Sequence, residues 1–247
     1  MKKITLLFTL LFAFAILSSA QEDYTMYKVV YIKPDYTKLK ELGKAMGEYN
    51  KTFNNDPEHR SHIWVVNSGP HTGEWLYVHG PTTFTNLDDR NITEKQKEHW
   101  RFEVMPNVAE LTDGSFWRMS DKLSYEGSTG FTGKEVLTFF KIKDFQEYRF
   151  KKLVKNVKEV YEEKEYPNFF QVYYSEFARI CGYDAMIAGG FENWAFFDNK
   201  PNFKKDYEEV HGEGSFQILM DEYKDVVENE FDEIIMYVPE LSADPVE

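Results

Sequence analysis

The chain has little cysteine: Cys181 is the only one in 247 residues. A single cysteine excludes an intramolecular disulfide, so the fold must be held together by packing alone. Cys181 precedes Gly182 in a predicted hairpin turn, and no activating partner lies near it in the sequence. These neighbours do not indicate a reactive thiol.

Positive charge is also scarce. The chain has 29 Lys and Arg against 42 Asp and Glu, which gives a formal net charge of −13. Loss of the N-terminal segment with Lys2 and Lys3 would change −13 to −15, because it removes two positive charges and no negative ones. Nucleic acids and anionic membrane surfaces repel such a protein. The composition therefore argues against both as partners.

Long hydrophobic runs are absent except at the N-terminus. Lys2 and Lys3 precede an apolar run over 4–17, and the small residues 18–20 stand before the polar Gln21. This pattern is typical of a cleavable secretory signal peptide, here 1–20 with the cut after Ala20, although an uncleaved anchor is the alternative. We therefore expect a secreted or periplasmic protein with no integral membrane segment after cleavage.

Familiar catalytic signatures are missing as well. A serine nucleophile elbow, a Walker loop and a Cys-x-x-Cys pair are all absent. Gly189 and Gly190 are not followed directly by a predicted helix, so a phosphate-binding loop is not indicated. The acidic clusters at 162–165 and 228–233 are typical of solvated helix ends. The sequence itself does not select a reaction.

The chain has enough apolar residues to form a core. Its predicted strands and helices also follow one order that occurs twice. Hydrophobic residues make up 42% and aromatic residues 17% of the sequence. The first half predicts a strand at 27–32, a helix at 39–53, a hairpin at 62–79, a helical region at 93–110 that is interrupted near Pro106, and a strand at 115–123.

The second half repeats this order. It predicts a strand at 135–142, a helix capped by Asp144, strands at 169–177 and 185–191, a helical region at 202–229 that breaks at 212–214, and a strand at 233–238. The two series are offset by roughly 110 to 118 residues, which suggests a duplication. We expect repeats at 21–126 and 134–247, joined by a glycine-rich linker at 127–133.

Each half reads β-α-β-β-α-β, the ferredoxin-like order, so the fold class is α+β. A second copy of the same sheet can cover the face that the helices leave open. With this order, and with the segments 84–88 and 194–198 in matching places, the chain resembles tandem dimeric α/β-barrel proteins. That superfamily includes antibiotic-biosynthesis-type and haem-degrading monooxygenases, chlorite-dismutase-like proteins and the NIPSNAP-like group. The resemblance implies an intramolecular barrel with a ligand pocket between its two sheets.

The hairpin at 62–79 predicts which side chains would line that pocket. If the turn is centred between Pro70 and His71, with Gly69 and Gly73 in permissive conformations, cross-strand partners follow. Aliphatic pairs then share one face: Ile63 with Val78, and Val65 with Leu76. The other face pairs His62 with His79, Trp64 with Tyr77, and Val66 with Trp75. We expect this aromatic face to point into the barrel.

Two opposed histidines would lie about 5 Å apart at their Cβ atoms, close enough to share a ligand. A metal site would need a third ligand, which the local sequence does not supply. A wet pair at a sheet end and polar contacts to an organic ligand are the other two interpretations. Tyr31, Arg118 and Tyr173 could also face inward. The full set of candidate pocket residues is His62, Trp64, Trp75, Tyr77, His79, Tyr31, Arg118 and Tyr173.

The leading hypothesis from the sequence is a protein that binds a small organic ligand between its sheets. The resemblance implies two alternatives: a cofactor-independent monooxygenase or isomerase, and a haem-binding protein. Chlorite-dismutase-like families hold haem through a histidine of their second half, where His211 is the residue to consider. A purely structural role would instead require a barrel packed shut by side chains. The duplicated halves allow either a monomer or a homodimer.

Overall fold

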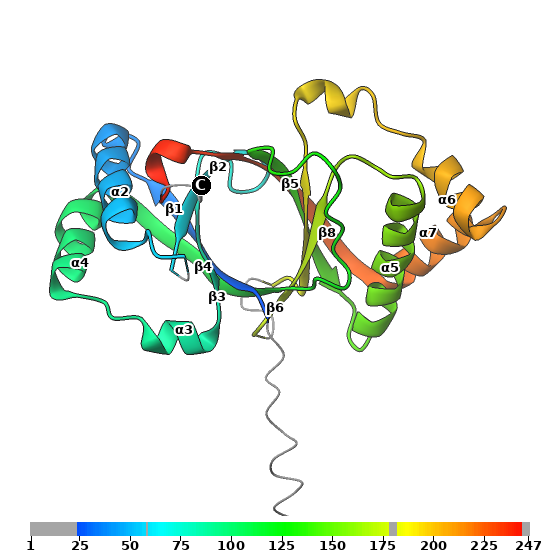
Figure 1. Ribbon diagram of the computed structural model, residues 1–247, viewed down its shortest axis with the longest axis horizontal. Helices are drawn as coiled ribbons and strands as arrows, with labels where there is room; N and C mark the ends of the chain where they lie inside the picture. Colours follow the sequence, from blue (N-terminus) through cyan, green and yellow to red (C-terminus); the bar gives the residue numbers. More distant parts are fainter. Residues whose placement is uncertain (1–23, 58, 178–181, 244–247) are drawn as a thin grey trace, which may run out of the picture.

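The computed structural model describes residues 24–57, 59–177 and 182–243. The expected signal peptide and Cys181 lie outside the described residues. Among the described helices, none is both long enough and apolar enough to cross a membrane. Figure 1 shows the architecture, with a barrel of strands between two groups of helices.

The first half contains four strands and three helices. The strands are β1 (Met26–Pro34), β2 (Ser61–Ser68), β3 (Trp75–Thr82) and β4 (Val108–Met119). The helices are α2 (Leu39–Phe53), α3 (Phe84–Asp89) and α4 (Glu94–His99), and α4 continues through a π-helical turn and a short 3₁₀ turn to Asn107. Two threonines start the short helices, since Thr83 and Thr93 accept N–H groups of Asn86 and Gln96 through their side chains.

The second half has the same kinds of elements. Its strands are β5 (Lys134–Ile142), β6 (Phe170–Ser175), β7 (Ala185–Gly190) and β8 (Val227–Tyr237). Its helices are α5 (Glu147–Glu163), α6 (Phe203–His211) and α7 (Ser215–Val226), with a 3₁₀ turn at Trp194–Phe197 before α6 and another at Pro239–Leu241 after β8. Gly212 and Gly214 have positive φ angles of 99° and 79° and separate α6 from α7, as expected.

The eight strands close into one barrel in the order β1-β3-β2-β8-β5-β7-β6-β4. Every pairing between neighbouring strands is antiparallel. The first half contributes β4-β1-β3-β2 and the second half contributes β8-β5-β7-β6, so β2 meets β8 and β4 meets β6. The fold is therefore α+β, with a closed antiparallel barrel and six helices in the described residues.

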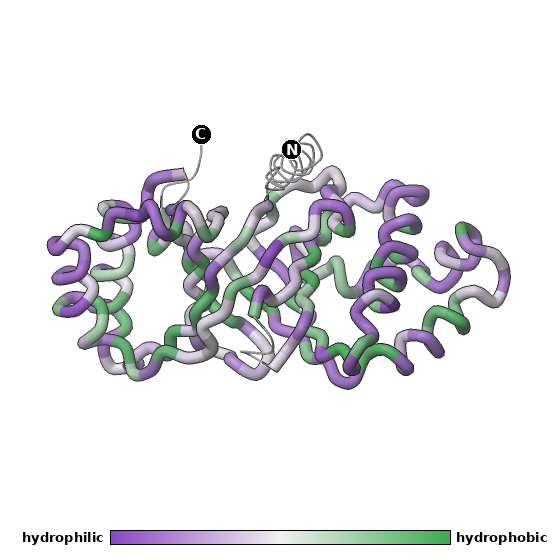
Figure 2. Tube along the Cα trace, turned by 90° about the horizontal axis from the view of Figure 1, so that it is seen from below, coloured by the Kyte–Doolittle hydropathy of each residue, from purple (hydrophilic) through white to green (hydrophobic). Residues whose placement is uncertain are grey.

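The core has three parts. One apolar cluster lies inside the barrel and includes Trp64, Trp117 and Phe139. A second cluster fills the space between α2 and the outer face of β1–β3, around Met46, and a third lies between α5–α7 and the outer face of the second-half strands, around Phe150. Figure 2 shows hydrophobic and hydrophilic residues alternating along the helices on both sides, which is the pattern of helices with one buried face.

Three details differ from the sequence-based expectation. Strand β8 begins at Val227, although the helical region was expected to run to Asn229. Strand β4 begins at Val108, inside the region expected to be helical. The first residue flanking α5 is Gln146, which makes no side-chain cap, so the expected capping by Asp144 is wrong. In the first two cases, long pairings with β5 and β1 outweigh the local helical pattern.

Candidate functional site

The β2–β3 hairpin has a register one residue away from the expected one. His62 lies opposite Val78, Trp64 opposite Leu76, and Ser61 opposite His79. The predicted opposition of His62 and His79 is therefore wrong, and the two side chains lie on opposite faces of the sheet. The reason is the turn: Val66 donates its N–H to the carbonyl of Glu74, which leaves seven residues in the loop instead of eight.

This shift moves three predicted pocket residues to the outer face, so their assignment to the barrel interior is wrong. Trp75 packs with the α2 cluster, and Tyr77 packs against it and donates its hydroxyl to Ser61 Oγ at 2.8 Å. His79 places Nδ1 3.0 Å from Ser61 Oγ and Nε2 3.5 Å from the Arg90 guanidinium. Burial, and then the charge of Arg90, lower the pKa of His79 to about 3, so the ring is neutral at physiological pH.

Arg118 is a fourth predicted residue that does not line the barrel interior. Its guanidinium forms an ion pair with Glu176 and lies 3.8 Å from the centre of the Tyr24 ring. Neither Glu176 nor Tyr24 lines the cavity. The expectation that Arg118 could face inward is therefore not met.

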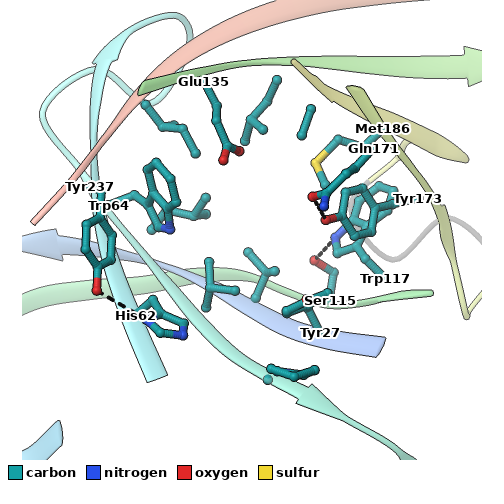
Figure 3. A pocket seen from close by; sticks show the side chains of 18 of the residues that line it. Tyr27, His62, Trp64, Ser115, Trp117, Glu135, Gln171, Tyr173, Met186 and Tyr237 are labelled. Atoms are coloured by element: carbon teal, nitrogen blue, oxygen red, sulfur yellow. Dashed lines mark hydrogen bonds between the residues drawn. The ribbon is translucent and has the colours of Figure 1, made fainter. Parts of the chain in front are cut away.

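The barrel interior holds a cavity of about 670 Å³. Tyr31, His62, Trp64 and Tyr173 line it, which are the other four residues that the sequence singled out. Alternate residues of every strand point inward, as the pleat requires. The wall is mostly aromatic and aliphatic; its larger members include Tyr27, Leu76, Val78, Trp117, Phe131, Leu137, Phe139, Met186, Ile235 and Tyr237. Figure 3 shows several of these side chains converging on one open space.

Most polar groups of the wall bond to each other. Trp117 donates its indole N–H to Ser115 Oγ at 2.8 Å, and the Tyr173 hydroxyl donates to Gln171 Oε1 at 2.6 Å (Figure 3). His62 Nδ1 lies 3.5 Å from the Tyr237 hydroxyl. Burial, and then the charge of Arg60, lower the pKa of His62, which favours its neutral form. These contacts fix the side chains that shape the cavity.

A buried carboxylate ties the β2–β3 turn to the barrel wall. The Tyr31 hydroxyl donates to Glu233 Oε2 at 2.6 Å, and His71 reaches Glu233 Oε1 with its backbone N–H at 3.1 Å and with Nδ1 at 2.7 Å. The rings of Tyr31 and His71 also lie with their centres 4.0 Å apart. Glu233 is fully buried and fully bonded, so its role is structural.

Glu135 is one of the cavity residues that were not predicted from the sequence, as are Tyr27 and Trp117. It lies near the start of β5, where the alternation Glu135, Leu137, Phe139 directs all three side chains inward. Figure 3 shows its carboxyl pointing into the open space. It makes no hydrogen bond or ion pair with any residue that the structure describes. Burial raises the pKa of Glu135 to about 7. The sequence does contain a sign of this position. Glu135 is spaced two residues from Leu137 and four from Phe139, so on a strand all three side chains lie on one face.

Tyr27 is another ionisable residue of the cavity wall, and the charge of Glu135 acts on it. Its pKa is raised by burial first, and then by the charges of Glu135 and Asp121. Tyr27 lines the cavity, and its hydroxyl makes no hydrogen bond with the described part of the chain. Its ring packs edge-to-face on that of Tyr173, with 5.8 Å between the centres. The cavity therefore combines one unpaired carboxyl with one unpaired phenol.

His211 does not fit the role of a haem ligand. It ends α6, outside the barrel, where its Nε2 donates to the carbonyl of Asn156 at 3.0 Å and its ring lies 4.4 Å from that of Tyr207. It does not line the cavity. Within residues 24–57, 59–177 and 182–243, no group of three His, Cys, Asp or Glu is arranged to hold a metal ion. His211 is therefore not placed to hold a haem in the barrel cavity.

Comparison with known proteins gives matches in structure but not in sequence. No family model matches the chain, and no curated protein matches it. A proposed monooxygenase from Lactobacillus acidophilus superposes with a TM-score of 0.53 at 9% identity, over 90% of this chain and 97% of that one. A proposed monooxygenase from Fusobacterium nucleatum gives 0.54 at 11% identity, over 88% and 94% of the two chains.

Chlorite dismutase from Candidatus Nitrospira defluvii, in complex with imidazole, gives a TM-score of 0.55 at 10% identity, over 87% of this chain and 92% of that one. Identities this low establish a shared fold and not a shared activity. The narrower resemblance to the NIPSNAP-like group stays a prediction. Together, barrel order and structural likeness show that this chain has the dimeric α/β-barrel fold.

Proposed function

We propose that this protein binds a small, largely apolar organic molecule inside its barrel. The observation that carries the proposal is the cavity of about 670 Å³, which lies between the two half-barrels and has a mostly aromatic and aliphatic wall. Natural ligand pockets have volumes of roughly 300 to 1,000 Å³ and the same kind of lining. Flat aromatic ligands suit such a wall because they can stack on or meet the edges of indole and phenol rings.

The open centre of the barrel supports ligand binding over a purely structural role. A structural barrel was expected to be packed shut, since empty apolar volume costs stability. Instead, inward-facing residues such as Val29, Ala188 and Ser115 leave the centre open. Arg60 borders the cavity and its buried Nε has no hydrogen-bond partner among the described residues. An oxygen atom of a ligand could accept from it.

We also propose an origin for the two halves and a location for the protein. The two halves, 21–126 and 134–247, are ferredoxin-like repeats that arose by duplication and build a barrel within one chain. The N-terminal segment 1–20 directs the protein to a secreted or periplasmic location. Identical strand order in the two halves supports the first statement, and the charged, apolar and small-residue pattern of 1–20 supports the second.

The binding proposal is tested with N-phenyl-1-naphthylamine, an uncharged aromatic dye whose fluorescence rises in apolar surroundings. The wild-type protein should bind the dye saturably. Ala188→Phe adds a ring to the wall at a buried position and should weaken binding at least about tenfold by filling the cavity. The matched control is Ala195→Phe, because Ala195 is exposed and lies in the 3₁₀ turn outside the cavity.

Equal binding by wild type and Ala188→Phe would show that the dye binds elsewhere and would contradict the proposal. Circular dichroism and thermal unfolding of both variants establish that they are folded. Native mass spectrometry of protein purified from its own host adds an independent observation, since a retained small molecule would identify the class of ligand directly.

A second candidate function is a cofactor-independent monooxygenase or isomerase. A specific observation favours it over simple binding: the unpaired carboxyl of Glu135 in the cavity. A protein that only binds apolar molecules has no need of such a group, whereas a catalyst of proton transfer does.

A further inference from the structure

Glu135 lowers the stability of the fold at its position. Its partners on the neighbouring strands are Gly190 of β7 and Ile235 of β8, and neither side chain can form a hydrogen bond. A carboxyl without partners is destabilising in apolar surroundings, and more so when it is ionised. Glutamine or leucine would satisfy the fold at lower cost. An unpartnered carboxyl with a raised pKa in a cavity is a candidate functional group.

The contrast with Glu233 shows what a structural carboxylate looks like in the same barrel. Glu233 is bonded by Tyr31 and by two groups of His71. Glu135 has no such bonds among the described residues, and Figure 3 shows it directed at the cavity. Its carboxyl is therefore available to a bound molecule.

We propose that Glu135 is a general base and acid that moves a proton within a bound enolisable ketone, with the Tyr27 hydroxyl as the hydrogen-bond donor to the ketone oxygen. This inference rests on the proposed binding function and adds a reaction and a substrate class to it. The substrate is a flat, largely apolar carbonyl compound with an acidic C–H bond beside the carbonyl group.

The reaction balances without any cofactor. The carboxylate of Glu135 removes a proton from the carbon beside the carbonyl, the C–H electron pair forms a C=C bond, and the carbonyl π pair moves to the oxygen. Tyr27 stabilises that oxygen by donating a hydrogen bond. The protonated Glu135 then returns the proton, either to the same carbon or to the far carbon of a conjugated system, which shifts a double bond. No electrons leave the substrate, so no oxidant is needed.

The electrostatic environment suits this role. Burial raises the pKa of Glu135 to about 7, which makes its carboxylate a stronger base while keeping a substantial ionised fraction near neutral pH. Mostly apolar side chains surround both groups, and a bound ketone would displace water from them, which strengthens their contacts with the substrate. Glu135 also influences the Tyr27 phenol directly, since its charge contributes to the raised pKa of Tyr27.

The test uses 2-tetralone and phenylacetone, two enolisable aryl ketones, in D₂O. Proton NMR follows the loss of the C–H signals beside the carbonyl as deuterium replaces hydrogen. The full mature protein should accelerate this exchange over buffer. Glu135→Gln should remove at least about 100-fold of the acceleration, and Tyr27→Phe should remove roughly 10- to 100-fold. The matched control is Glu228→Gln, an exposed carboxylate that forms an ion pair with Lys141 outside the cavity.

A pH profile separates a catalytic role from a structural one. The wild-type exchange rate should rise from pH 5 to pH 8 with a midpoint near 7, because the ionised carboxyl is the base. Glu135→Gln should lose this rise. Exchange no faster than in buffer, or a Glu135→Gln variant as active as wild type, overturns the inference.

Quenching of tryptophan fluorescence measures ketone binding separately, and Trp64 and Trp117 in the wall are the reporters. Binding without accelerated exchange overturns the catalytic inference and leaves the binding proposal intact. Failure of both ketones and of N-phenyl-1-naphthylamine to bind overturns the binding proposal and the inference that rests on it.

Discussion

At the scale of single residues, burial, neighbouring charges and hydrogen bonds decide the role of each ionisable group in the barrel. His62 is kept neutral by burial and by Arg60, because both lower its pKa. Glu233 is held by hydrogen bonds from Tyr31 and His71, and so it stabilises the fold. Glu135 has a raised pKa and no bond within the described chain, so its ionisation opposes folding.

The stability of the protein should therefore depend on pH through Glu135. The folded-state pKa is about 7, above the usual value of 4.5. Below pH 4.5 the carboxyl is protonated in both states and has no effect. Between pH 4.5 and 7 the unfolded chain loses the proton first, so stability falls as pH rises. The loss should be complete above pH 7, at roughly 2 to 3 kcal/mol, given partial screening by water in the cavity.

Urea unfolding at pH 4.5, 6 and 8 measures this effect. Glu135→Gln carries no ionisable group, so it should become more stable than wild type as the pH rises, with the largest difference at pH 8. Glu228→Gln serves as the control, since its exposed ion pair should contribute less than about 1 kcal/mol. A constant difference between wild type and Glu135→Gln at all three pH values would disprove the assignment.

At the scale of elements, the β2–β3 turn sets the register of the hairpin that shapes the cavity. Gly69 has a φ of +119°, and an added Cβ would lie 2.7 Å from the Asp232 carbonyl oxygen and from Glu233 Cγ. Gly73, with a φ of +90°, donates its N–H to the Val66 carbonyl and closes the loop. The turn thus decides that His62 and Trp64 face inward with Leu76 and Val78, not with Tyr77 and His79.

We expect Gly69→Ala to destabilise the protein by about 2 kcal/mol or more, because it combines an unfavourable φ with a clash against the backbone of β8. The control is Gly130→Ala, where φ is +62° and nothing lies within 4 Å of the new Cβ. That change should cost only the left-handed conformation, about 1 to 2 kcal/mol. Thermal unfolding compares the two; equal losses for both variants would mean that the close approach to β8 has no role.

At the scale of the whole molecule, the barrel is built from strands of both halves. The two half-barrels meet along β2–β8 and β4–β6, and residues from both halves form the apolar cluster inside. Each half alone would expose an inner face that carries residues such as Trp64 or Phe139, together with two open strand edges.

Segments 21–126 and 134–247, produced separately, should therefore not form folded monomers. Each should aggregate or self-associate, and mixing the two during refolding should restore binding of N-phenyl-1-naphthylamine. Analytical ultracentrifugation and circular dichroism provide the measurements. A folded, monomeric half with native-like unfolding would show that the inner faces do not need each other.

Part of this picture could be predicted from the sequence, because it depends on local periodicity. The apolar spacing of Leu42, Met46 and Tyr49 marked α2, and the β-branched runs marked β1 and β5 close to their observed bounds. The inward direction of His62 and Trp64 also followed from alternation along β2. Strand β8 was cut short in the prediction, since its acidic start at 228–233 forms a strand only by pairing with β5.

By itself, the sequence determined the order of strands and helices, the break between α6 and α7 at Gly212 and Gly214, and the apolar faces that need covering, because these follow from interactions between near neighbours. Only the tertiary structure decided which faces meet. Trp75 and Tyr77 are as suited to a helix-covered face as to a barrel interior, so composition could not choose between them. The turn and the closure of the barrel made that choice, and the same closure left Glu135 unpaired in an apolar cavity.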